Sequence, residues 1–333
     1  MKAYIESIEY YLPERTVSNK ELSKEFGDLT CEQIFTKTGI GSRHVASKHE
    51  TAADLGRRAA EKLFQRNQHQ PHDIDFLIFC SQSPVHPLPN AACEIHECLG
   101  LKNTAGAIDI NLGCSGYVYS LSLAASLIST NTCRNILLVT GDTYTKYLRH
   151  NDRNRTIFGD AGTATIVRKC PEEENYQLSN FVFGTDGSKA DHLVYPAKYP
   201  LPADGQEGFN NQSKIGLVMN GPGILSFTLD KVPVVLQSVL DQSSLDKSLI
   251  DFFVLHQANG FVLDQINKKF GIPPNKQVAF FSETGNTVSG TIPLALKHLS
   301  DTNRLKKTTN IILAGFGVGL SWAGCLATTA ETL

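Results

Sequence analysis

The chain has 333 residues, of which 41% are hydrophobic and 19% are charged, a composition typical of an ordered globular protein. Its 31 Lys and Arg residues against 33 Asp and Glu residues leave a formal net charge of −2, which argues against a non-specific nucleic-acid binder, because such proteins need a basic excess. Eight cysteines, with no C-x-x-C pair, exclude a disulfide scaffold and fit a reducing compartment.

We expect no signal peptide in the N-terminal residues. They carry Lys2, Glu6 and Glu9 and no apolar stretch of the kind that a signal peptide needs. The longest weakly polar run, residues 311–327, is interrupted by four glycines and is shorter than the ~20 residues of a spanning helix. We therefore expect a cytoplasmic protein without a membrane segment.

Two pairs of short apolar runs repeat along the chain. Residues 74–80 (IDFLIFC) resemble residues 250–256 (IDFFVLH), and residues 134–139 (RNILLV) resemble residues 309–314 (TNIILA). The two pairs are separated by nearly the same distance, 176 and 175 residues, and each run is typical of a strand buried on both faces. The spacing predicts a duplicated chain, with halves at 1–171 and 172–333.

Within each half, a glycine turn and an apolar helix lie between the two apolar runs. The helix that follows Cys114 is apolar on nearly every side, which indicates a helix buried in the centre of the protein. Its counterpart follows Gly290. Strands that alternate with helices predict an α/β fold with mostly parallel sheets and a helix pair between two sheets. Residues 170–177 would join the halves, and residues 199–214 are expected to form a long surface loop.

Cys114 is the strongest candidate for a nucleophile. It lies in the run NLGCSG, between a predicted strand at 106–110 and the buried helix. Free N–H groups and the dipole at a helix N-terminus favour a thiolate, so we expect a lowered thiol pKa. The alternative is that Cys114 is simply a small buried residue.

His256 and Asn286 are candidate partners in the second half. His256 ends a predicted strand, and Asn286 occupies a glycine-flanked turn before the second apolar helix. By the 176-residue spacing, His256 corresponds to Cys80, and Cys114 corresponds to Gly290 near Asn286. A pseudo-twofold axis would bring the two helix N-termini together, so the three side chains could converge. Taken alone, His256 could equally be a core histidine and Asn286 a turn residue.

Eight short motifs are spread along the chain around these three residues: Tyr11-Leu12-Pro13-Glu14, Thr38-Gly39-Ile40 with Arg43-His44, Ala91-Ala92-Cys93-Glu94-Ile95, Gly113-Cys114-Ser115-Gly116, Phe158-Gly159-Asp160, His256-Gln257-Ala258-Asn259, Gly285-Asn286-Thr287 and Gly315-Phe316-Gly317-Val318-Gly319. Through these motifs the chain resembles, over nearly its whole length, the β-ketoacyl-acyl-carrier-protein synthase III branch of the thiolase superfamily. The resemblance implies a five-layered αβαβα sandwich and a homodimer.

The resemblance also implies a reaction, a decarboxylative Claisen condensation. Cys114 would take an acyl group from an acyl-CoA primer, and backbone N–H groups of Cys114 and Val318 would hold the oxyanion. His256 and Asn286 would donate hydrogen bonds to the thioester carbonyl of malonyl-acyl-carrier protein as carbon dioxide leaves. Coenzyme A or phosphopantetheine thioesters would be substrates, and no metal or redox cofactor is required.

Several substrate-binding positions depart from the family pattern. Gln33 stands where an adenine-stacking Trp is usual, Lys37 replaces a phosphate-pairing Arg, and Phe261 replaces another Arg. Arg153 belongs to a basic loop, with Lys146, Arg149 and Arg155, that could bind a carrier protein instead. The remaining positions expected at the substrate are Leu88, Phe158 and Gly317. The departures predict a specialised member of the family.

Other readings of the same residues lead to different classes of protein. A Cys, a His and an Asn also serve in thiol hydrolases, or in acyltransferases that form no carbon–carbon bond. A scaffold protein would leave Cys114 unreactive. We do not expect Gly315 and its neighbours to form a dinucleotide loop, because that fingerprint needs a following helix and an acidic residue about 20 positions on, and 18 residues follow Gly315 in this sequence. Cys93, His96 and Cys98 do not share a helix face, so we expect no metal there.

Overall fold

The computed structural model describes residues 2–66, 69–195, 216–331 and 333. A five-stranded sheet is built from residues before 170. Its strands, in spatial order, are β1 (Ala3–Tyr11), β7 (Ala161–Lys169), β6 (Asn135–Asp142), β4 (Phe76–Cys80) and β5 (Gly106–Ile110). β4 is parallel to β5 and β6, whereas β7 is antiparallel to β6 and β1.

A four-stranded sheet from residues after 176 repeats this pattern. Its strands, in the corresponding order, are β8 (Gln177–Thr185), β13 (Ser321–Thr329), β12 (Thr309–Gly317) and β11 (Phe252–Leu255). β11 pairs parallel with β12, and β13 pairs antiparallel with both β12 and β8. The first sheet pairs Phe76 with Ile136 and the second pairs Phe252 with Ile311, which reproduces the spacings of 176 and 175 residues. The α/β class and the predicted repeat are therefore confirmed.

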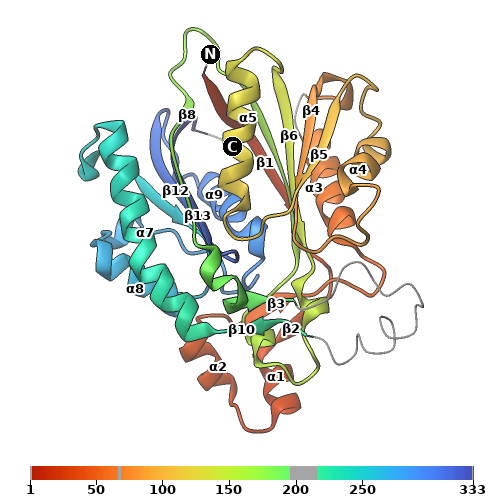
Figure 1. The fold of residues 1–333 in the computed structure, drawn as a ribbon, viewed down its shortest axis with the longest axis vertical. Helices are drawn as coiled ribbons and strands as arrows, with labels where there is room; N and C mark the ends of the chain where they lie inside the picture. Colours follow the sequence, from red (N-terminus) through yellow and green to blue (C-terminus); the bar gives the residue numbers. More distant parts are fainter. Residues whose placement is uncertain (1, 67–68, 196–215, 332) are drawn as a thin grey trace.

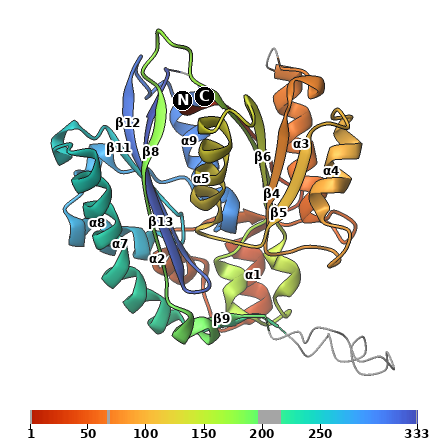
Figure 2. The same cartoon turned by 45° about the horizontal axis from the view of Figure 1, so that its top comes forward.

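Helices complete five layers around the two sheets (Figure 1, Figure 2). The outer face of the first sheet is covered by α3 (Ala52–Arg66) and α4 (Ala91–Leu99). The layer between the sheets contains α5 (Gly116–Ser129) and α9 (Thr291–Asp301). The outer layer on the second sheet contains α7 (Gly221–Ser243) and α8 (Gly260–Phe270).

The central layer explains why α5 is apolar nearly all round. α5 contacts strands of both sheets, and Tyr117, Leu121 and Ile128 are fully buried. These residues belong to one cluster with α9 residues such as Leu296. Full burial of each such side chain stabilises the fold by about 1.5–3 kcal/mol. The core between the sheets thus holds the N-termini of α5 and α9 in fixed positions.

Short elements gather at the lower end of the molecule in Figure 1. They are β2 (Thr16–Ser18), β3 (Ser42–His44), β9 (Leu193–Val194), β10 (Val218–Met219), α1 (Asn19–Phe26) and α2 (Cys31–Thr38). The predicted loop at 199–214 lies outside the described residues. Residues 170–176 connect β7 to β8, and the assignment of whole domains to 1–171 and 172–333 stays a prediction.

Helix α7 is a second long apolar segment, in addition to residues 311–327. By length and composition α7 could cross a membrane, with 39% of its apolar window buried. One such helix is weak evidence, because core helices pass the same test. Leu236 and Val239 of α7 are buried in a cluster with strand residues of the second sheet, which accounts for the apolar composition.

Candidate active site

Cys114, His256 and Asn286 line one cavity of about 100 Å³. Cys114 lies in the turn between β5 and α5, His256 follows β11 directly, and Asn286 lies in the loop that leads to α9. The elements come from both halves of the chain, and the cavity is formed where they meet. The structure therefore brings together the three side chains that the sequence analysis placed in a common site.

Two glycines at the carboxyl end of β12 allow that strand to approach Cys114. A methyl side chain at Gly315 would lie 2.7 Å from the Cys114 carbonyl oxygen, and one at Gly317 would lie 2.9 Å from the Cys114 sulfur. Neither distance leaves room for a larger residue. Gly317 lines the cavity, as does Phe158, so both of these predicted positions face the candidate nucleophile.

The predicted lowering of the Cys114 thiol pKa is wrong. Burial of the thiol, together with the nearby Asp142 carboxylate, raises the pKa of Cys114 to about 12. The backbone N–H groups of Val318 and of Cys114 act in the opposite direction, but they do not outweigh burial. Cys114 precedes the first residue of α5 by two positions. The free protein consequently carries a neutral thiol at pH 7.

His256 is a neutral imidazole fixed by its surroundings. The residue is 2% exposed, and burial lowers the pKa of its ring to about 3. Its Nδ1 atom lies 2.7 Å from the Thr291 hydroxyl, and its ring meets Phe316 edge-on, with 5.5 Å between the centroids. The Thr291 hydroxyl also donates to the Val288 carbonyl at 3.2 Å, so in this arrangement its oxygen accepts a hydrogen bond from Nδ1 of His256.

Asn286 is oriented by its own backbone and by the turn that follows it. The Val288 N–H donates to the Asn286 side chain at 2.9 Å, which identifies the accepting atom as Oδ1. The Asn286 N–H donates to the Ile157 carbonyl at 2.9 Å, and the Asn286 carbonyl accepts from the Gly159 N–H at 3.1 Å. The Nδ2 group has no partner within the described part of the chain, so it remains available to a ligand.

A buried carboxylate that sequence reasoning missed ties the two halves together behind the cavity. Asp142, the last residue of β6, accepts hydrogen bonds from the Gln82 N–H at 2.9 Å and the Ser83 hydroxyl at 3.1 Å. It also accepts from the N–H and hydroxyl of Ser289, in the turn before α9. Burial raises the pKa of Asp142 to about 6. Its position at the carboxyl end of a predicted strand was the one available signal.

The other predicted binding positions lie outside this cavity's lining. Leu88 is 79% exposed on the loop before α4, and Phe261 is 51% exposed in the first turn of α8. Lys37 is exposed on α2. Val318 contacts Cys114 through its backbone N–H but lines a neighbouring cavity instead. The structure thus places Phe158 and Gly317 at the nucleophile, and Leu88, Phe261 and Lys37 at the surface.

The basic loop at 146–155 is partly neutralised by acidic residues that follow β2. Arg153 pairs with Asp28, and Arg155 pairs with Glu25. Such exposed pairs contribute only about 0–1 kcal/mol to stability, but they reduce the positive charge of the loop. The sequence did not indicate this pairing, because more than a hundred residues separate the partners.

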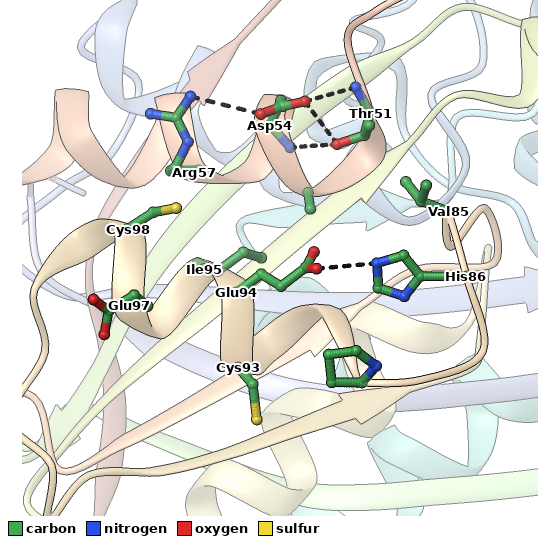
Figure 3. A pocket seen from close by; sticks show the side chains of 12 residues that line it. Thr51, Asp54, Arg57, Val85, His86, Cys93, Glu94, Ile95, Glu97 and Cys98 are labelled. Atoms are coloured by element: carbon green, nitrogen blue, oxygen red, sulfur yellow. Dashed lines mark hydrogen bonds and ion pairs between the residues drawn. The ribbon is translucent and has the colours of Figure 1, made fainter.

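A larger, open hollow of about 690 Å³ lies between α3, α4 and the loop that carries Val85 and His86 (Figure 3). Its polar contacts include His86 with Glu94 at 3.0 Å and Asp54 with both Arg57, at 3.6 Å, and the Thr51 hydroxyl, at 2.8 Å. In the part of the chain that the structure describes, no group of three or more His, Cys, Asp and Glu side chains could hold a metal ion. The hollow contains none of the three candidate catalytic side chains.

Two family models match the chain. Residues 108–187 match the family described as 3-Oxoacyl-[acyl-carrier-protein (ACP)] synthase III, and residues 240–329 match its C-terminal family. A "Beta-ketoacyl-[acyl-carrier-protein] synthase III 2" of Halalkalibacterium halodurans is 35% identical, covering 98% of this chain and 96% of that protein. A "Beta-ketoacyl-[acyl-carrier-protein] synthase III" of Streptococcus sanguinis is 33% identical, covering 98% and 99%.

Solved structures agree in fold. A crystal structure of a 3-oxoacyl-(acyl-carrier-protein) synthase III superposes with a TM-score of 0.92 at 42% identity, covering 98% of this chain and 99% of that one. A 3-oxoacyl-(acyl-carrier protein) synthase from Burkholderia xenovorans gives a TM-score of 0.91 at 34% identity, covering 100% and 95%. The five-layered arrangement of this chain is therefore the arrangement of these proteins.

Proposed function

Because this chain belongs to the 3-oxoacyl-[acyl-carrier-protein] synthase III family, a family of acyl-transferring condensing enzymes, we propose that it condenses an acyl thioester primer with malonyl-acyl-carrier protein. The reaction is a decarboxylative Claisen condensation that yields a 3-oxoacyl thioester, in fatty-acid or related specialised acyl biosynthesis. The observation that carries the proposal is the convergence of Cys114, His256 and Asn286 on one cavity.

The first stage transfers the primer to Cys114. The Cys114 sulfur attacks the thioester carbonyl, and the bond to the sulfur of coenzyme A breaks as the new thioester forms. Because the resting group is a thiol, its proton must leave, and the neutral imidazole of His256 can pass it to the departing sulfur. The backbone N–H groups of Cys114 and Val318 stabilise the oxyanion of the tetrahedral intermediate.

The second stage forms the carbon–carbon bond. His256 Nε2 and Asn286 Nδ2 donate hydrogen bonds to the thioester carbonyl of the malonyl group. Negative charge grows on that oxygen as carbon dioxide leaves, so these donors stabilise the transition state more than the ground state. The enolate carbon then attacks the acyl-Cys114 carbonyl. The Cys114 thiolate departs and takes up a proton to regain the thiol.

The two stages require different tautomers of His256, and Thr291 permits both. In the first stage Nδ1 carries the proton and donates to the Thr291 oxygen, which leaves Nε2 free to accept. In the second stage the Thr291 hydroxyl turns its hydrogen from the Val288 carbonyl to Nδ1, which leaves the imidazole proton on Nε2. The 2.7 Å contact supports this role. Thr291 acts here as a positioning residue for the imidazole.

The primer and extender would reach the cavity as coenzyme A or phosphopantetheine thioesters. Lys37, Arg153 and Phe261 would contact the carrier at the surface, whereas Phe158 and Gly317 would contact the reacting groups. A cytoplasmic homodimer is part of the proposal. The dimer, though not the location, is supported by the position of β5 at the edge of its sheet and by the exposure of Leu88.

Incubation with acyl-CoA primers and malonyl-acyl-carrier protein, with product analysis by mass spectrometry, tests the proposal. We expect a 3-oxoacyl product and one carbon dioxide per turnover. Acyl transfer to water or to an alcohol without carbon dioxide release would instead identify a hydrolase or an acyltransferase that uses the same three residues. A Cys114 thiol that no thioester acylates would indicate a scaffold protein.

A further inference from the structure

A second cavity of about 120 Å³ adjoins the candidate active site and has several polar groups among its apolar lining. Five of its lining residues carry amide or phenol groups: Gln82, Asn111, Tyr144, Tyr147 and Tyr195. The first cavity, by contrast, is lined mainly by apolar side chains around the three candidate catalytic groups. The two cavities therefore suit different parts of a substrate.

The second cavity lies next to the nucleophile. Leu193 lines both cavities, and Val318, whose N–H contacts Cys114, lines the second. Tyr144 packs in one apolar cluster with Cys114 and Phe158, and the Tyr144 and Phe158 rings are 5.4 Å apart. An acyl group attached to Cys114 can extend into this cavity while the first cavity holds the malonyl thioester.

Hydrogen bonds in this cavity fix which polar atoms face an occupant. The Tyr144 hydroxyl donates to Gln82 Oε1 at 3.0 Å, which orients the Gln82 amide and leaves its Nε2 group as a donor. The Tyr144 oxygen keeps its capacity to accept. Within the described ranges of the chain, neither Gln82 Nε2 nor the Asn111 side chain has a hydrogen-bond partner. The Tyr144 hydroxyl is therefore already paired, whereas Gln82 is half-buried, so an alkyl group that fills the cavity would displace water from its Nε2 group and leave that donor without a partner.

We infer that this cavity binds the tail of a short acyl primer that carries an oxygen substituent, either a hydroxyl or a keto group, beyond its thioester carbonyl. A cavity of about 150 Å³ holds a benzene ring, so one of about 120 Å³ has room for roughly four or five non-hydrogen atoms. The tail of a 3-hydroxybutyryl group has three carbons and one oxygen after its carbonyl. Its oxygen can accept from Gln82 and, as a hydroxyl, donate to Tyr144.

The inference rests on the proposed function, because it assumes that Cys114 becomes acylated. The step involved is the transfer of the acyl carbon from the sulfur of coenzyme A to the Cys114 sulfur, with the thiol proton passing to coenzyme A. No oxidant or other co-reactant is required. The second cavity alters which primer is transferred and leaves the bonds made and broken unchanged.

The matched probes are 3-hydroxybutyryl-CoA, as each enantiomer, and 3-methylbutyryl-CoA, in which a methyl group replaces the hydroxyl. The rate at which each acylates Cys114 is measured by intact mass. We expect one 3-hydroxybutyryl enantiomer to react at least about tenfold faster, because an alkyl tail leaves the polar groups unpaired. Equal rates, or a faster 3-methylbutyryl probe, would overturn the inference while leaving the acyl-Cys114 proposal intact.

Two variants connect the preference to the cavity. Tyr144→Phe and Gln82→Leu keep the shape of the lining but remove its hydrogen-bonding groups, so each should reduce the preference toward unity. Tyr119→Phe removes a phenol whose oxygen contacts the Gly184 carbonyl at 3.5 Å, away from the cavity, and serves as the control. An unchanged preference in both cavity variants would contradict the assignment. Failure of Cys114 to be acylated by any thioester would instead refute the proposed function.

Discussion

The two halves of the chain share a topology but differ in the chemistry that they place at equivalent positions. β4 ends at Cys80, whose thiol is fully buried and donates to the Leu112 carbonyl at 3.1 Å. The equivalent strand of the second half is followed by His256, which faces the cavity. Cys114 stands just before Ser115, the N-cap of α5, and Ser289 takes the same place before Gly290, the N-cap of α9. The duplicated fold therefore fixes the position of a side chain, and the type of residue at that position determines whether it can take part in catalysis.

The largest effect on activity is expected from substitution of Cys114, compared with substitution of Cys80 in the same half. Cys114→Ala should abolish both acylation and condensation, because it removes the sulfur that carries the acyl group. Cys80→Ala should retain acylation at Cys114, since Cys80 is a packing residue. Intact mass after incubation with an acyl-CoA measures both. Acylation that persists in Cys114→Ala, or disappears in Cys80→Ala, would contradict the assignment of Cys114 as the nucleophile.

Substitution of Asn286 should affect the two stages of the reaction differently. Asn286→Ala should reduce carbon dioxide release from malonyl-acyl-carrier protein by roughly 10²–10³-fold, the usual effect of removing one oxyanion donor. Acylation of Cys114 should change much less, because Asn286 is assigned only to the second stage. Asn275→Ala, at an exposed position, is the control. If both stages slow equally, Asn286 has a structural role rather than the role of a donor.

The effect at Thr291 should be smaller. Thr291→Val keeps the shape of the side chain but removes the hydroxyl at Nδ1 of His256, a hydrogen bond of about 1 kcal/mol, so we expect roughly a fivefold to tenfold loss in condensation. Thr291→Ser should restore most of the rate. The pH dependence of acylation should change in Thr291→Val, because the imidazole loses its partner. Equal rates and pH profiles for Val and Ser would exclude the tautomer role.

Substitution of Asp142 should have the smallest effect, a shift in the pH dependence of Cys114 alkylation. Alkylation of Cys114 by iodoacetamide requires the thiolate, so the rate should rise with pH without a plateau near neutrality, because the thiol pKa lies near 12. The Asp142 carboxylate contributes to that elevation, so Asp142→Asn should move the profile to lower pH. A plateau at neutral pH in the unmodified protein would contradict a neutral resting thiol.

The fold and the three central residues could be predicted because their signals lie within short segments. The alternation of apolar runs and their repeat gave both sheets, and the all-round apolar pattern placed the helix after Cys114 in the core. The register of Phe76 with Ile136 and of Phe252 with Ile311 confirms the spacing on which the convergence was predicted.

The electrostatics of the site depend on residues that are distant in sequence and could not be predicted from one segment. The helix N-terminus suggested a low pKa for Cys114, but the carboxyl end of β12 buries the thiol and Asp142 raises its pKa. The charge of Arg153 is offset by Asp28, 125 residues away. The lining of the second cavity likewise comes from six separated segments, two of which contribute Gln82 and Tyr144.

The most direct test of the account is a single-turnover chase. The enzyme is first acylated on Cys114 by a labelled acyl-CoA, freed of excess substrate, and then mixed with malonyl-acyl-carrier protein. The account predicts that the label leaves Cys114 at the rate at which carbon dioxide is released and appears in the 3-oxoacyl product. Label that appears as the free acid, without carbon dioxide release, would contradict the assignment of Cys114, His256 and Asn286 to condensation.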